Sequence, residues 1–149
     1  MSIWLRTASL EQLNAATAGT MMRTLGIVFT EMGPDFLRAA MPVDERTRQP
    51  YGLLHGGASV TLAETLGSTG ANLCVDSERF LCVGQEINAN HLRAAKSGRV
   101  IGTARPVHIG GRSHVWGIEI ANEAGVLVCI SRITMAVIER PLPPGAPAS

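Results

Sequence analysis

The chain contains one long helical segment, from about Gly57 to Cys74, and this segment limits the folds that are open to it. Apolar side chains recur there near the helical period. Small residues are also frequent, and Gly67 and Gly70 each lower intrinsic helix stability by ~1 kcal/mol relative to alanine. Packing against other elements must offset that loss, so we expect the helix to be embedded in the protein.

Strand-like segments lie on both sides of this helix. Two short ones precede it, and four longer ones follow it, separated by turn residues. Connections this short favour antiparallel pairing. The sequence therefore predicts an α+β fold of the hotdog type, a six-stranded antiparallel sheet wrapped around one long central helix. The expected strands are Gly26–Thr30, Phe36–Met41, Phe80–His91, Arg99–His108, His114–Ala121 and Val126–Ile138.

The remaining segments fit a single domain. A length of 149 residues leaves no room for a second full-sized one. A capping box at Ser9 and Gln12 predicts a short helix near the N-terminus, with a further helical turn within Thr17–Met22. We expect one hotdog domain over residues 1–140 and a disordered, proline-rich tail over residues 141–149.

Charge and hydropathy exclude two classes of partner. The formal net charge is +1, and no run of Lys and Arg supplies the basic stripe that nucleic-acid binding requires. No window approaches the ~18 uninterrupted apolar residues that a membrane span needs. Hydrophobic residues nevertheless make up 46% of the chain, so apolar surface is available for subunit interfaces. We therefore expect a homo-oligomer with no nucleic-acid or membrane partner.

Cysteine usage indicates a reducing compartment. Cys74, Cys82 and Cys129 are odd in number, widely spaced and set among apolar residues. No Cys/His spacing typical of zinc is present, so we expect neither disulfides nor a metal site. The patterns of nucleotide cofactor sites are absent as well. We expect a cytoplasmic protein without a cofactor.

Glu64 is the first candidate for chemistry. It lies in the middle of a helical segment that is otherwise apolar or small, with no basic residue three or four positions away. Glutamate is rarely buried unless it is paired or functional. Ser68 lies one helical turn further on and shares its face, where it can orient a water or the carboxylate. The alternative is that Glu64 occupies a solvated stripe of the helix.

The second candidate cluster precedes the helix, in the segment from Gln49 to Gly57. Gly56 and Gly57 stand at the helix start, where backbone N–H groups have no intrahelical acceptor. Such amides suit a developing oxyanion, and His55 can orient the loop through a backbone hydrogen bond. The alternative is a flexible loop without a catalytic role.

Helix geometry then limits how the two candidates can cooperate. Gly56 and Glu64 are eight residues apart, which is about 12 Å along an α-helix. A polarised carbonyl and the group that attacks it must approach within about 3.5 Å. If both residues act in one reaction, Gly56 must come from one chain and Glu64 from a neighbouring chain.

The segment Gln49–Ser68 (QPYGLLHGGASVTLAETLGS) is more specific as a whole than any of its parts. It resembles the 4-hydroxybenzoyl-CoA thioesterase superfamily, in the branch that carries its catalytic glutamate on the central helix. The resemblance extends to Met41–Asp44, Val83–His91 and Gly98–His108. It is closest to bacterial thioesterases that act on 1,4-dihydroxy-2-naphthoyl-CoA or on aryl-carrier-protein thioesters.

The resemblance implies a role for each residue of the two clusters. Glu64 would be the nucleophile or general base, and the Gly56 amide would polarise the thioester carbonyl. Gln49 and His55 would support that carbonyl or the leaving thiolate, while Ser68 would orient the water. The implied reaction is metal-free hydrolysis of an acyl-CoA, with aryl-CoA favoured and medium-chain acyl-CoA as an alternative. The resemblance also implies a site formed across a subunit interface, in a dimer at minimum and usually in a tetramer.

The resemblance also implies where coenzyme A binds. Gly84 would line the passage of the pantetheine arm, and Arg93 and Arg112 would contact the phosphates. The implied coenzyme A contacts are His91, Leu92, Arg93, Ala94, His108, Ile109, Gly110, Gly111, Arg112 and Ser113.

Two other readings stay open at this point. A hotdog hydratase would use a histidine with an acidic partner; His55 is present, but the hydratase signature is not. A non-catalytic acyl-CoA-binding protein would need neither Glu64 nor a glycine-led helix start. Release of thiol from an acyl-CoA separates hydrolysis from both.

Overall fold

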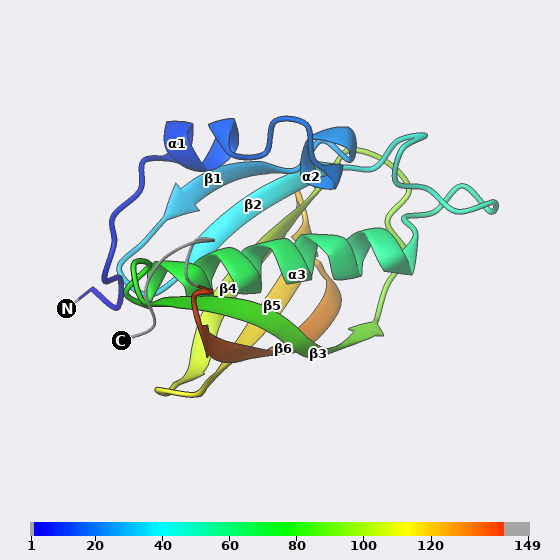
Figure 1. The fold of residues 1–149 in the computed structure, drawn as a ribbon. Helices are drawn as coiled ribbons and strands as arrows, with labels where there is room; N and C mark the ends of the chain where they lie inside the picture. Colours follow the sequence, from blue (N-terminus) through cyan, green and yellow to red (C-terminus); the bar gives the residue numbers. More distant parts are fainter. Residues whose placement is uncertain (1, 142–149) are drawn as a thin grey trace.

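A computed structural model describes residues 2–141 of the chain. Its longest helix, α3 (Gly56–Leu73), lies along the concave side of a curved sheet (Figure 1). Two short helices, α1 (Leu10–Ala15) and α2 (Met21–Thr24), lie beside the first two strands. The strands are β1 (Val28–Met32), β2 (Leu37–Pro42), β3 (Phe80–His91), β4 (Arg99–Ile109), β5 (Ser113–Asn122) and β6 (Leu127–Glu139).

The sheet is six-stranded, with the order β1-β2-β4-β5-β6-β3, and every neighbouring pair is antiparallel. The strand that follows the helix, β3, is therefore carried to the edge of the sheet, beside the last strand. This arrangement confirms the predicted α+β hotdog fold with one long central helix. Strand β3 has a register irregularity between Gly84 and Glu86, where the pairing with β6 shifts by one residue.

The central helix is embedded, as its glycines predicted. Side chains from the sheet occupy the space that β-carbons would take on two of them. A β-carbon on Gly67 would collide with the Ile133 side chain, and one on Gly70 would lie 2.9 Å from the Trp116 ring. The close approach of sheet and helix explains why this segment keeps glycines that lower its intrinsic stability.

The N-terminal segment packs over the far end of this helix. The Trp4 ring stacks on the buried Trp116 ring, with the two centroids 6.0 Å apart and an interplanar angle of 11°. The Trp4 indole N–H donates to the Gly33 carbonyl at 2.7 Å. The predicted capping box is also present, with Ser9 and Gln12 each accepting a hydrogen bond from the other's backbone N–H.

Two predicted boundaries were wrong for the same physical reason. We expected a helical turn within Thr17–Met22 and a strand from Gly26, but α2 begins at Met21 and β1 at Val28. Gly19 and Gly26 both have φ of 71°, a left-handed conformation that ends a helical turn and does not continue a strand. The predicted tail, residues 141–149, lies almost entirely outside the described residues.

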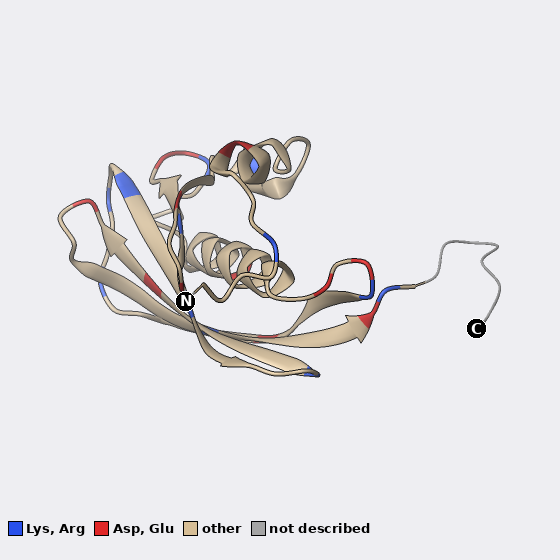
Figure 2. Ribbon diagram, turned by 90° about the vertical axis from the view of Figure 1, so that its left-hand side faces the viewer, with Lys and Arg blue, Asp and Glu red and all other residues tan. Residues whose placement is uncertain are grey.

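Charged residues are spread over the molecule, and Figure 2 shows acidic and basic positions on separate short stretches rather than in one continuous stripe. This distribution agrees with the formal net charge of +1. None of the helices within residues 2–141 is long and apolar enough to cross a membrane.

Candidate active site

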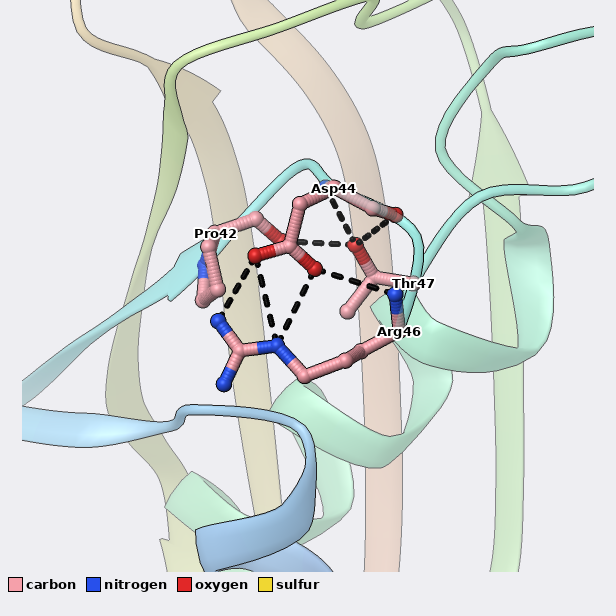
Figure 3. A network of polar contacts seen from close by, with 4 residues as sticks. All are labelled: Pro42, Asp44, Arg46 and Thr47. Atoms are coloured by element: carbon pink, nitrogen blue, oxygen red, sulfur yellow. Dashed lines mark hydrogen bonds and ion pairs between the residues drawn. The ribbon is translucent and has the colours of Figure 1, made fainter.

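The loop between β2 and α3 carries Gln49 and His55, and Thr47 fixes its path (Figure 3). The buried Thr47 hydroxyl donates to the Pro42 carbonyl at 2.7 Å and accepts from the Asp44 amide at 3.1 Å. The Thr47 carbonyl accepts the His55 amide at 2.8 Å. Thr47 therefore links the end of β2 to His55, the residue directly before α3.

An ion pair closes the same turn. The Arg46 guanidinium contacts both carboxylate oxygens of Asp44, the shortest contact being 2.6 Å, and the Arg46 amide also donates to that carboxylate. These hydrogen bonds hold the pKa of Asp44 below its usual value. The pair is exposed to solvent, so its main effect is on loop geometry rather than on stability.

The start of α3 leaves one backbone donor free. His55 is the N-cap: its Nδ1 accepts the Gly57 amide at 2.8 Å, and its carbonyl accepts the amides of Ala58 and Ser59. Because Nδ1 accepts, the neutral imidazole carries its proton on Nε2. Within residues 2–141 the Gly56 amide has no acceptor. The helix start thus offers a single unpaired N–H at its positive end.

Gln49 lies beside that free amide with its own donor available. Its side-chain oxygen accepts the Tyr51 backbone N–H, and its side-chain NH₂ group has no acceptor among the described residues. Gln49 and Gly56 line one cavity of about 300 Å³. The other residues around it are Leu53, Leu54, Ser59, His91, Leu92, Arg93, Ala94 and Val128.

His91 explains why residue 56 is a glycine. A β-carbon on Gly56 would lie 2.6 Å from the His91 Nε2 atom, so the imidazole rests directly against the helix start. His91 ends β3, which brings the last residues of that strand to the free amide. We call Gln49, His55, Gly56 and His91 the Gly56 half-site.

Glu64 lies further along α3, in a separate cavity of about 350 Å³. Its carboxylate rests on Gly84 of β3, with Oε1 2.5 Å from the place that a β-carbon on Gly84 would take. Ser68 lines the same cavity, as predicted from its place one turn on. Burial raises the pKa of Glu64 above its usual value, because removal from water disfavours the charged form. We call Glu64, Ser68 and Gly84 the Glu64 half-site.

One chain holds the two half-sites apart. Gly56 and Glu64 are separated by about 12 Å of helix, and they line different cavities. On the sheet, Gly84 pairs with Met135 and His91 pairs with Cys129, so the two half-sites are about 20 Å apart along the strands. A single copy cannot present the Gly56 amide and the Glu64 carboxylate to the same atom.

The residues expected to contact coenzyme A are divided in the same way. His91, Leu92, Arg93 and Ala94 line the cavity of the Gly56 half-site. The turn from His108 to Ser113 lies at the opposite end of the sheet, where Ser113 pairs with Ala136 beside the Glu64 half-site. One chain therefore does not bring residues 91–94 and residues 108–113 together. Arg93 lies at the Gly56 half-site, and Arg112 lies toward the Glu64 half-site.

Sequence reasoning missed the contribution of α2 to the Glu64 cavity. Met21 and Met22 of α2 line it together with Glu64. Met21 is 63% exposed although it is apolar, and it lies at the mouth of a cavity next to a carboxylate. An exposed methionine in a short helix gives no signal in the sequence, because only the fold places α2 over α3. Within the described residues no group of three or more His, Cys, Asp or Glu side chains has a metal-binding arrangement.

Comparison with known proteins assigns this geometry to a family. The profile of the thioesterase superfamily matches residues 51–129, which include both half-site glycines and Glu64. The chain belongs to the thioesterase superfamily. It is 54% identical to the 1,4-dihydroxy-2-naphthoyl-CoA hydrolase of Escherichia coli, over 91% of this chain and 99% of the relative. It is 50% identical to the proofreading thioesterase EntH of Cronobacter sakazakii, over 91% and 98%.

Solved structures of this superfamily agree with the fold. A mutant thioesterase from Pseudomonas aeruginosa superposes with a TM-score of 0.92 at 51% identity, covering 93% of this chain and all of that one. A thioesterase from Haemophilus influenzae gives a TM-score of 0.89 at 46% identity, over 92% and 95%. As a member of the thioesterase superfamily with such relatives, the chain is an enzyme of the thioester hydrolase class.

Proposed function

We propose that this thioesterase hydrolyses acyl-CoA thioesters in a site formed by two copies of the chain. The observation that carries the proposal is the separation of the two half-sites. One chain presents an unpaired backbone N–H at Gly56 and, about 12 Å along the same helix, a half-buried carboxylate at Glu64. A two-fold related copy can place the Glu64 of one chain opposite the Gly56 of the other, twice per dimer.

The proposed reaction follows from the groups on each side. The Gly56 N–H and the free NH₂ group of Gln49 donate to the thioester carbonyl oxygen and stabilise the negative charge that develops there. Glu64 either attacks the carbonyl carbon or removes a proton from a water that attacks it, with Ser68 holding that water. On either route the C–S bond breaks and the sulfur leaves as a thiolate. On the nucleophilic route this step leaves an acyl–Glu64 anhydride, which water then hydrolyses to the carboxylic acid and the free Glu64 carboxylate, and the thiolate takes up the proton that this acid releases. On the general-base route the acid forms directly, and the proton that Glu64 took from the water passes to the thiolate.

His55 has a positioning role in this proposal. Its Nδ1 is occupied by the Gly57 amide, so the ring fixes the helix start that presents the Gly56 N–H. Its protonated Nε2 is left as a second donor toward the carbonyl or the thiolate. The role expected from the resemblance thus combines with a capping role that the helix itself requires.

Coenzyme A would span the two chains. Arg93 of one chain and Arg112 of the other are the proposed phosphate contacts, since guanidinium groups match phosphate oxygens. Gly84 leaves space beside Glu64 for the pantetheine arm. The remaining proposed contacts are His91, Leu92, Ala94, His108, Ile109, Gly110, Gly111 and Ser113.

The acyl group would occupy the cavity beside Glu64. Met21, Met22 and Val60 give it apolar walls, while Thr61, Thr65, Ser68 and Thr69 add hydroxyl groups. Apolar walls with a few hydroxyls suit an aromatic acyl group that carries polar substituents, and flexible methionines also accommodate a medium-length alkyl chain. The named activity of one relative, on 1,4-dihydroxy-2-naphthoyl-CoA, favours the aromatic class.

The test is thiol release from a panel of thioesters, with benzoyl-CoA, 1,4-dihydroxy-2-naphthoyl-CoA, a medium-chain acyl-CoA and an aryl-carrier-protein thioester compared by kcat/KM. Released thiol can be followed with DTNB because the protein's own three cysteines, although free, are buried and so do not react with the reagent. Burial raises the pKa of Cys74 and of Cys82 to about 11, so these thiols remain protonated in the assay. Glu64→Gln should keep the fold and lose most of the turnover.

Tight binding of the same thioesters without thiol release would favour the second candidate function, a non-catalytic acyl-CoA-binding protein. The half-buried carboxylate of Glu64 counts against it, because a pure binding site gains nothing from a buried charge. The proposal also includes a cytoplasmic location, which the unpaired cysteines support, and assembly into a homotetramer. Size-exclusion chromatography with light scattering measures the oligomeric state.

A further inference from the structure

Both edges of the sheet are held by an asparagine side chain in the same way. At one edge, the Asn14 side-chain amide donates to the Phe29 carbonyl at 2.9 Å and accepts the Phe29 N–H at 2.8 Å. At the other edge, the Asn72 amide donates to the Cys82 carbonyl and accepts the Cys82 N–H, both at 2.9 Å. Each amide therefore pairs with an edge strand as a neighbouring strand would, at β1 and at β3 respectively.

The Asn72 side chain also makes a hydrogen bond to the backbone of α3. Its second side-chain N–H donates to the Ser68 carbonyl at 2.9 Å, so both hydrogens of the NH₂ group and the carbonyl oxygen are used. The side chain is thus fixed in one orientation on α3. Glu64, Ser68 and Asn72 follow one another at four-residue steps, which places them along one side of the helix.

The strand residue that Asn72 holds is two positions from the one that Glu64 touches. Side chains two apart in a strand point to the same face, so Cys82 and Gly84 both face the helix. Cys82 is buried there, and the Glu64 Oε1 atom lies against Gly84. Directly after Gly84 the pairing with β6 shifts by one residue before it resumes at Glu86, so Gly84 lies at the one irregular point of this strand pair.

We propose that Asn72 is a positioning residue that fixes β3 on α3 so that Gly84 confines the Glu64 carboxylate in its reactive orientation. This inference rests on the proposed function of Glu64. Without the Asn72 pair, the first half of β3 can slide or lift relative to α3, and the Glu64 side chain gains other rotamers. Misplacement of a reacting group by about 1 Å can reduce the rate of the chemical step by about 100-fold.

Asn14 provides a matched control for the experiment. Asn14→Ala removes the same reciprocal pair of hydrogen bonds at the opposite edge of the sheet, while the backbone contacts of residue 14 remain. We expect Asn72→Ala to lower kcat by about 10- to 100-fold and to change KM less than about threefold. Asn14→Ala should lower Tm about as much as Asn72→Ala does, but it should leave kcat within about twofold of the wild type. Equal losses of kcat in the two variants, or a wild-type kcat in Asn72→Ala, would overturn the inference.

A second variant covers the case in which Asn72→Ala does not fold. Asn72→Asp keeps the shape and the acceptor for the Cys82 N–H but loses the donations to Cys82 and Ser68, so it should show the same selective loss of kcat. Combining either variant with Gly84→Ala gives a double-mutant cycle. If Asn72 acts through the contact between Gly84 and Glu64, the two losses will not add; full additivity counts against the inference.

A readout without turnover separates this inference from the proposed function. The pKa of Glu64 can be followed by carbon-13 NMR of labelled glutamate in the wild type and in both alanine variants. Among the described residues, none of the others that line the Glu64 cavity is charged. The elements beside it carry Arg23 on α2 and Glu86 on β3. Loosening of β3 should return the pKa toward its usual value in Asn72→Ala and not in Asn14→Ala. An unchanged pKa in Asn72→Ala would refute the inference even if no thioester were hydrolysed.

Discussion

The Glu64 carboxylate lies against the backbone of Gly84, with Oε1 2.5 Å from the position of a β-carbon on that residue. No side chain fits there unless the carboxylate moves, because real β-carbons do not approach an oxygen so closely. We therefore expect Gly84→Ala to displace Glu64 and to lower kcat by about 100-fold, with little change in Tm. Steady-state kinetics beside thermal unfolding measure both quantities.

Gly117 supplies the control for this substitution. It also lies within a strand, but a β-carbon there would meet only the Val107 side chain, at an ordinary 3.6 Å. Gly117→Ala should retain wild-type kcat. If Gly84→Ala were equally active, the contact between Gly84 and Glu64 would have no role in the reaction.

The ionisation of Glu64 should set opposite trends for activity and stability. Burial raises its pKa in the folded protein, so the folded state favours the neutral acid more than the unfolded state does. The ionised form needed for reaction is lost as pH falls through that raised pKa, and kcat/KM should fall with it. Stability instead declines as pH rises through the same pKa, so Glu64→Gln should have a higher Tm than the wild type at pH 7.

Scanning calorimetry from pH 4 to pH 8 checks the stability trend. The advantage of Glu64→Gln should shrink as the pH is lowered, because the wild-type carboxylate then becomes neutral as well. A difference in Tm that is independent of pH would show that the two side chains differ in packing rather than in charge.

Mixing two inactive variants tests whether the site is shared between chains. A Glu64→Gln chain lacks the carboxylate, and a Gln49→Ala chain lacks a donor of the Gly56 half-site. Co-expression of both should restore about a quarter of the wild-type activity, because half of the dimers are mixed and each mixed dimer keeps one intact site. Activity no higher than that of the two separate variants would place both half-sites in one chain.

The Thr47 hydroxyl should contribute both to the stability of the protein and to the geometry of the loop before α3. Thr47→Val keeps the shape of this buried side chain but leaves the Pro42 carbonyl and the Asp44 amide without their partner. The loss should be about 1–3 kcal/mol, measured by urea unfolding, with a lower kcat as the loop loosens. Thr24→Val is the control, since the exposed Thr24 hydroxyl bonds only to the Thr20 carbonyl one turn earlier.

Much of the fold could be predicted from the sequence because its signals are local and long. Helix α3 and the later strands were predicted to within two residues, with β3 placed at Phe80–His91. The first strand was less well placed, because Gly26 was read as part of it although its φ is positive. The strand order was not predicted: the position of β3 at the sheet edge depends on how the whole sheet closes around the helix.

In the candidate site, too, the residues that could be predicted are those whose signal lies within one element. Glu64, Gly56 and their 12 Å separation follow from one helix and could be read in advance. Asn72 could not, because its partner Cys82 lies in another element and a lone asparagine near a helix end has many ordinary explanations. Met21 and Met22 were missed for the same reason, since their cavity exists only once α2 rests on α3.

The stack of Trp4 on Trp116 gives the molecule its own optical probe. These are the only two tryptophans in the chain, and one sits in the N-terminal segment while the other is buried under the central helix. Fluorescence and near-ultraviolet circular dichroism will therefore report the docking of the first residues on the core. Strand pairing can be followed separately in the far ultraviolet, so the order of the two folding events is measurable without any added label.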